Sequence, residues 1–153
     1  MNDDVLVLEE FLPYRLSVLS NRLSAAIAEA YSRRFGLSIP EWRVMAVLAL
    51  EPGLSAAEVA DRTAMDKVAV SRAVGRLIST GRARREVSAG DRRRSMLELT
   101  ADGRRIYRRI APALQRYEAE LLAVLDPPDR RQLEALLGRL ESRAAALQPP
   151  RIE

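Results

Sequence analysis

Residues 54–100 read LSAAEVADRTAMDKVAVSRAVGRLISTGRARREVSAGDRRRSMLELT. Two helical patterns come first, each opened by a capping residue, and a short connection at 63–65 joins them. Strand patterns follow at 82–87 and 95–99, with turn residues and three consecutive arginines between them. Two short helices and a basic hairpin are the layout of a winged helix-turn-helix, in which the second helix enters the DNA major groove and the hairpin lies beside it.

The second helix of this stretch is predicted between Asp66, its capping residue, and Gly81. One face repeats apolar residues at helical spacing: Val70, Val74, Leu77 and Ile78. The opposite face carries polar side chains with small residues among them: Lys67, Ser71, Arg72 and Arg76, with Ala69, Ala73 and Gly75. Basic side chains reach phosphates or guanine edges, and small residues let a helix approach the bases. An ordinary solvated helix face would show the same pattern of residues. The capped helix that precedes this one, opened by Ser55 and Glu58, favours a reading helix.

The hairpin is predicted to be basic at its tip. Arginines at 92–94 follow the turn residues 88–91, and an arginine on a hairpin tip can enter a narrow minor groove, where the negative potential is enhanced. Asp91 cannot favour contact with a phosphate, so we expect it to hold the turn or to orient a neighbouring arginine. The candidate DNA-binding residues of the whole stretch are Ser55, Lys67, Ser71, Arg72, Arg76, Arg84, Asp91, Arg92, Arg93 and Arg94.

Two helices are predicted before this stretch. Residues 12–35 carry a heptad-like apolar stripe, made of Leu12, Leu16, Leu19, Leu23, Ala26 and Ala30. Ser38 and Glu41 form a capping box for a second, largely apolar helix at 40–50. The first helix is too long to bury its stripe against a short domain, so a partner helix from another subunit is expected, with packing inside one chain as the alternative.

Two more helices are predicted after the hairpin. Thr100 is expected to cap a helix that runs to about Leu125 with a kink at Pro112, and Asp126 to cap a last helix from Pro127. The fold expected is thus mainly α-helical with a small β-hairpin wing. The expected divisions are an N-terminal dimerisation helix at 1–36, a winged helix-turn-helix domain at 37–100 and C-terminal dimerisation helices at 101–153.

Composition narrows the classes of function. The chain has no cysteine and no histidine, which excludes disulfides, thiol redox sensing and the usual zinc sites and removes the commonest general base. We therefore expect no enzyme, no metal and no cofactor. Residues 72–109 hold 12 arginines against 4 acidic residues, a balance suited to phosphate neutralisation, with a solvated arginine face as the alternative. No run of about 18 apolar residues and no basic secretion signal are present, so a cytoplasmic protein is expected.

Three strings resemble the MarR family of bacterial transcription regulators: IPEWRVMAVL at 39–48, MDKVAVSRAVGRL at 65–77 and GDRRRSMLELT at 90–100. The last string carries the Asp-x-Arg feature of the family's wing and its Leu-Thr ending, and is the most specific of the three. The resemblance covers nearly the whole chain.

This resemblance implies a homodimer whose terminal helices interlock and which binds a near-palindromic operator in double-stranded DNA, usually as a repressor. It implies that Arg93 lies at the minor groove and that Lys67, Ser71 and Arg72 lie on the reading helix. It also implies that a small anionic aromatic ligand binds between the dimerisation helices and the winged domain and loosens the hold on DNA.

Such a ligand needs a cation and an apolar wall. The candidates on the first two predicted helices are Tyr14, Arg15, Arg22, Trp42 and Arg43. Arg15 and Arg22 share a helix face, but salt bridges between chains or simple solvation explain them equally well, and Trp42 also suits the core. Two other functions fit the residues: an architectural DNA binder without an effector, or a winged-helix module that contacts another protein.

Overall fold

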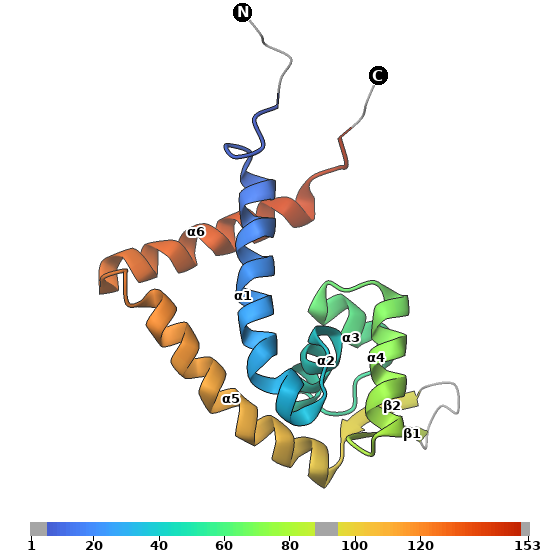
Figure 1. Cartoon of the computed structure of the whole chain (residues 1–153). Coiled ribbons are helices and arrows are strands. Elements are labelled where there is room, and N and C mark those ends of the chain that lie inside the picture. The colour runs from blue at the N-terminus through green and yellow to red at the C-terminus, as the bar shows by residue number, and fades with distance from the viewer. Residues whose placement is uncertain (1–5, 88–94, 151–153) are drawn as a thin grey trace, which may run out of the picture. The chain divides into compact units, whose positions relative to one another are not determined.

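A computed structural model describes residues 6–87 and 95–150, shown in Figure 1. Within these ranges the chain forms helices and one hairpin in the order α1 (Leu12–Phe35), α2 (Ile39–Leu50), α3 (Ala56–Thr63), α4 (Lys67–Ser79), β1 (Ala83–Val87), β2 (Ser95–Leu99), α5 (Ala101–Leu122) and α6 (Pro127–Ala146). This confirms the predicted fold class. The chain divides into two compact units, one up to Leu114 and one from Gln115 onward. The three-part division expected from the sequence stays a prediction.

The predicted helix caps are present. In α2 the Ser38 Oγ atom accepts the Glu41 N–H at 3.3 Å, and Glu41 Oε2 accepts the Ser38 N–H at 2.6 Å. Ser55 and Glu58 repeat this arrangement in α3, with distances of 3.2 and 2.7 Å. The remaining caps are made by single side chains: Asp66 for α4, Thr100 for α5 and Asp126 for α6. Each helix from α2 to α6 therefore begins where its own local sequence satisfies the first N–H groups.

The hairpin pairs β1 with β2 in antiparallel register, with Ala83 opposite Leu99 and Arg85 opposite Leu97. Leu54 adds a backbone bridge to Leu97, because the Leu97 N–H donates to the Leu54 carbonyl at 2.8 Å. Leu97 and Leu99 are buried, whereas the residues of β1 after Ala83 are exposed. Side chains of β2 therefore close the core, and β1 is exposed after Ala83.

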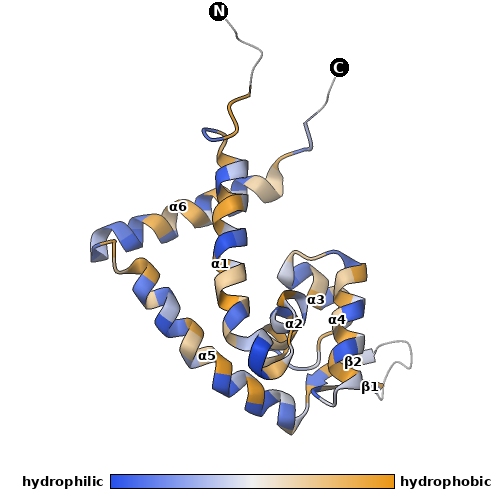
Figure 2. Cartoon of the chain, in the orientation of Figure 1, coloured by the Kyte–Doolittle hydropathy of each residue, from blue (hydrophilic) through white to orange (hydrophobic). Residues whose placement is uncertain are grey.

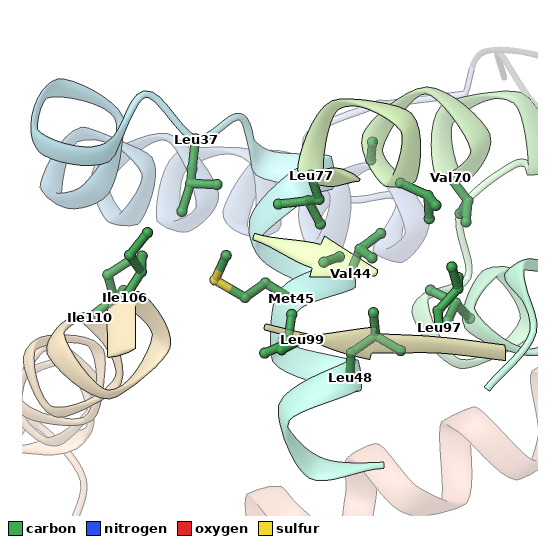
Figure 3. Packing of buried hydrophobic residues seen from close by; sticks show 14 of the residues in the cluster. Leu37, Val44, Met45, Leu48, Val70, Leu77, Leu97, Leu99, Ile106 and Ile110 are labelled. Carbon is green, nitrogen blue, oxygen red and sulfur yellow. The ribbon is translucent and has the colours of Figure 1, made fainter. Parts of the chain in front are cut away.

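The core of the unit up to Leu114 is apolar, and Figure 3 shows its packing. Side chains from α2, α4, the hairpin and α5 meet there, among them Val44, Met45, Leu48, Val70, Val74, Leu77, Leu97, Leu99, Ile106 and Ile110. Because α4 contributes a full helix face to this core, its opposite face is left outside. Ala73 is also part of the core, so its assignment to the exposed face of α4 was wrong.

Rows of exposed leucines lie on α1 and α6, whose apolar residues are orange in Figure 2. On α1 these are Leu12, Leu16 and Leu19, and on α6 they are Leu133, Leu136, Leu137 and Leu140. No residue of α6 is buried. In the described ranges, none of the helices combines the length and the apolar content that a membrane crossing requires.

Candidate nucleic-acid interface

The outer face of α4 is a strip of exposed side chains. The core takes four of its residues: Val70, Ala73, Val74 and Leu77. The exposed ones are Lys67, Val68, Ser71, Arg72, Gly75, Arg76 and Ser79. Four of these are the predicted reading residues, and no acidic side chain lies among them. The strip can present cations to phosphates and polar or apolar groups to base edges.

Val68 is the residue of this strip that sequence reasoning missed. Its side chain is 59% exposed although valine is apolar. It lies one turn before Arg72 and therefore on the same face of α4. That spacing was readable in the sequence and was overlooked because apolar residues in an amphipathic helix are assumed to face the core. In a major groove an exposed methyl group of this kind can contact the methyl group of thymine.

Arg84 is engaged by its neighbours on the hairpin. Its Nη2 atom donates to Glu98 Oε2 at 2.9 Å and lies 3.1 Å from Glu86 Oε1. The hydrogen bond that Arg84 donates to Glu98, helped by the charge of Glu86, raises the pKa of Arg84 above its ordinary value. Two carboxylates already accompany this guanidinium, so it offers less net positive charge than an unpaired arginine. The other predicted wing residues, Asp91, Arg92, Arg93 and Arg94, lie outside the described residues.

Ser55 and Arg82 have structural partners. The Ser55 Oγ atom accepts the Glu58 N–H in the α3 cap. Arg82 Nη2 donates to the carbonyl of Phe35 at 2.5 Å and so caps the last turn of α1. Some of the arginines counted in the basic segment therefore stabilise the fold. The arginine content of residues 72–109 therefore indicates DNA contact less directly than the exposed strip of α4 does.

A groove runs along one edge of α4. It has a volume of about 700 Å³ and lies between the end of α1, the start of α2 and α4. Arg72 and Arg76 line it from α4, and Glu41 lines it from α2. The Nε atom of Arg76 lies 3.8 Å from Glu41 Oε1. Sequence reasoning assigned Glu41 only to the helix cap and did not foresee its burial beside the reading helix.

The candidate ligand residues are brought together only in part. Trp42 stacks between Tyr31 and Tyr107, with ring centroids 5.5 and 5.6 Å apart. Burial raises the pKa of the Tyr31 hydroxyl, while the charge of Arg43 acts in the opposite direction. Arg43 Nη2 also reaches Ser24 Oγ at 3.4 Å. A guanidinium therefore lies next to an aromatic stack that joins α1, α2 and α5.

The three candidates on α1 lie along the helix before this stack. At about 1.5 Å per helical residue, Arg22 is roughly 13 Å and Arg15 roughly 24 Å along the axis from Tyr31. Tyr14 is next to Arg15, and all three candidates are exposed. The aromatic stack thus has Trp42 and Arg43 close together, whereas Tyr14 and Arg15 lie farther along α1.

Comparison with known proteins agrees with the resemblance to the MarR family. The sequence model of that family matches residues 35–94. The chain is 31% identical over 133 residues to the HTH-type transcriptional repressor Rv2887 of Mycobacterium tuberculosis, covering 86% of this chain and 92% of that protein. The structure of that protein in complex with p-aminosalicylic acid is similar with a TM-score of 0.67, over 86% of this chain and 98% of the other, at 30% identity.

Two further solved structures are similar over most of their length. The MarR/EmrR family regulator from Acinetobacter sp. ADP1 has a TM-score of 0.85 at 25% identity, covering 93% of this chain and 100% of that chain. The PcaV regulator from Streptomyces coelicolor, solved with its natural ligand, has a TM-score of 0.72 at 26% identity, covering 92% and 98%. The relatives are transcriptional regulators, in agreement with the expectation that the chain is not an enzyme.

Proposed function

Because this chain belongs to the MarR family of transcriptional regulators, we propose that it is a dimeric repressor whose hold on a near-palindromic operator is controlled by a small anionic aromatic ligand. The observation that carries the DNA-binding part is the exposed strip of α4. Its cations, hydroxyl and small residues lie on one side of a helix whose other side is locked into the core. The wing arginines, Arg93 above all, supply further contacts in this proposal.

The dimer part rests on the exposed leucines of α1 and α6. Each helix carries a row of them at helical spacing, and contiguous exposed apolar surface of this kind marks an interaction site. A second copy of the chain is the occupant proposed, because a two-fold pair of reading helices matches a palindromic operator.

The ligand part rests on the aromatic stack beside Arg43. Trp42 and the two tyrosines supply an apolar wall, and the guanidinium supplies a cation. Two relatives were solved with ligands: PcaV with its natural ligand and Rv2887 with p-aminosalicylic acid. The proposed mechanism is a shift of population. The ligand favours a dimer whose two reading helices no longer match adjacent major grooves, about 34–36 Å apart.

A binding titration tests the function. A duplex is first selected from a random library with the wild-type chain, and its affinity is then compared with that of a random duplex at physiological salt. A sequence-specific regulator is expected to prefer the selected duplex by about 10³-fold or more. Equal affinities would favour an architectural DNA binder, and absence of binding would favour a protein-contact module. Addition of p-aminosalicylic acid or other aromatic carboxylates tests the ligand, which is expected to release the duplex.

A further inference from the structure

Among the described residues, Glu41 is the charged side chain that is buried in the core, with 5% of its surface exposed. Its Oε2 atom closes the capping box of α2 by accepting the Ser38 N–H. A glutamine would supply the same acceptor, because capping boxes use Glu and Gln alike. The cap therefore explains the position of this side chain but does not explain its charge.

The other carboxylate oxygen of Glu41 faces the reading helix. Oε1 is buried and accepts no hydrogen bond within the described part of the chain. Burial of a carboxylate is costly unless a cation pairs with it. The cation at this oxygen is Arg76, whose Nε atom lies 3.8 Å away on α4. At that separation the contact is an ion pair rather than a hydrogen bond.

The ion pair engages the inner end of the Arg76 guanidinium. Nε lies nearest to Glu41, while 68% of the side chain is exposed. Most of the five N–H donors of arginine are on Nη1 and Nη2, which take no part in this ion pair. The pair therefore leaves the outward edge of the guanidinium available for a second anion.

The ion pair between Glu41 and Arg76 also counters the repulsion between Arg76 and Arg72. It lies four residues before Arg76 and lines the same groove. Like charges at this spacing on a helix repel each other. The carboxylate of Glu41 draws Arg76 toward the α2 side of the groove and offsets that repulsion. A side chain that is already restrained also loses less rotamer entropy when it binds.

We propose that Glu41 is a positioning residue for DNA binding: its buried carboxylate holds Arg76 at the edge of α4 so that Nη1 and Nη2 meet a DNA phosphate. The inference rests on the proposed function, since it requires α4 to lie against DNA. Glu41 itself acts only through Arg76, because its own oxygens are covered.

A double-mutant cycle in the full chain tests this role. The dissociation constant of the selected duplex is measured by fluorescence anisotropy for the wild type, Glu41→Gln, Arg76→Gln and the double variant. Glu41→Gln is expected to weaken binding 3- to 10-fold in the wild-type background and less than 2-fold in the Arg76→Gln background. Glutamine keeps the cap, so thermal stability serves as the check that α2 is intact.

Asp126→Asn is the control, because it likewise replaces a helix-capping carboxylate with an amide, at the start of α6. It is expected to change the affinity less than 2-fold. The inference is overturned if Glu41→Gln weakens binding equally in both backgrounds, leaves it unchanged or tightens it. If the wild type selects no preferred duplex, the proposed function fails and the inference falls with it. If the wild type prefers the selected duplex but the effects of Glu41→Gln and Arg76→Gln are independent, the inference alone is overturned.

A spectroscopic measurement on the free protein provides a second readout. The Nε–H resonance of Arg76, assigned by comparison with Arg76→Gln, is expected to be shifted away from the main arginine cluster in ¹⁵N spectra of the wild type. Glu41→Gln is expected to return it to that cluster. A resonance already at the position of exposed arginines in the wild type would show that Glu41 does not restrain it.

Discussion

Gly103 lies directly against the backbone carbonyl of Arg82: a Cβ atom on Gly103 would be 2.0 Å from that oxygen. The same carbonyl accepts the Thr100 N–H at 3.0 Å, and Thr100 Oγ1 donates to the Gly81 carbonyl at 2.7 Å. The first turn of α5 is therefore fastened to the segment that connects α4 to β1. A displacement of the start of α5 would therefore disturb the backbone that connects α4 to β1.

The close approach at Gly103 predicts that Gly103→Ala destabilises the protein. Backbone must move to admit the methyl group, which costs about 1–3 kcal/mol in a packed region. For a chain of this size each kcal/mol lowers the melting temperature by roughly 2–4 °C. Thermal unfolding followed by circular dichroism measures the effect, and a melting temperature equal to that of the wild type would contradict it.

Gly75→Ala is predicted to have the opposite effect on stability. Nothing lies within 4 Å of a Cβ atom at Gly75, and alanine in a helix interior is favoured over glycine by about 0.5–1 kcal/mol. The added methyl group would nevertheless stand on the exposed strip of α4 and hinder its approach to DNA. A more stable protein with weaker affinity for the selected duplex is expected. Unchanged affinity would show that this part of α4 does not come close to DNA.

Arg93→Ala is predicted to weaken operator binding by about 1–3 kcal/mol while leaving the dimer intact. The loss of one phosphate-neutralising cation should also reduce the slope of log affinity against log salt by about 1. Arg131→Ala removes a charge from α6, outside the basic segment, and is the matched control. Mobility-shift titrations at several salt concentrations measure both quantities. Equal effects of the two substitutions would count against the wing.

Leu137→Glu is predicted to produce a monomer. The substitution places a charge in the exposed leucine row of α6, where a second copy is proposed to pack. Loss of the dimer should also abolish tight operator binding, since one reading helix then acts alone. Light scattering after size-exclusion chromatography measures the mass. Leu50→Glu, at an exposed leucine of α2, is the control and should remain dimeric.

The protein is predicted to lose stability at alkaline pH because of the buried hydroxyl group of Tyr31. Burial raises the pKa of its hydroxyl above the ordinary value of about 10, although Arg43 opposes this. The folded state thus binds the proton more tightly than the unfolded state. The stabilisation is complete below pH 10 and is lost as the pH rises through the folded pKa. Between pH 8 and 11, Tyr31→Phe should lose less stability than the wild type in urea titrations. Parallel losses would contradict the assignment.

Local signals in the sequence were sufficient to predict the helices and strands of the fold. The capping boxes at Ser38 and Ser55 predicted where α2 and α3 begin, because a capping box satisfies N–H groups within four residues of chain. Gly36 predicted the end of α1, and it adopts the left-handed conformation there. The predicted strands at 82–87 and 95–99 agree with the observed hairpin to within a residue.

The candidate interface was predictable only in outline. Apolar spacing predicted which face of α4 is buried, but Ala73 was assigned to the wrong side and Val68 was overlooked. Ala73 lies at the edge of the buried face, where the helical period alone does not decide exposure. Val68 lies on the outer face with Arg72, where an apolar side chain is not expected. The sequence also did not reveal which arginines form hydrogen bonds within the protein. Arg84 donates to Glu98 on β2, and Arg82 donates to the Phe35 carbonyl on α1.

The sequence by itself determined where the helices begin, approximately where they end, and that a strand–turn–strand segment rich in arginine follows α4. These features depend on hydrogen bonds and apolar repeats within a few residues. Only the tertiary structure decided that Glu41 is buried beside Arg76 and that Gly103 lies against Arg82. Such contacts join residues 21 to 35 positions apart, and they arise because packing of whole helices, rather than local preference, sets which side chains meet.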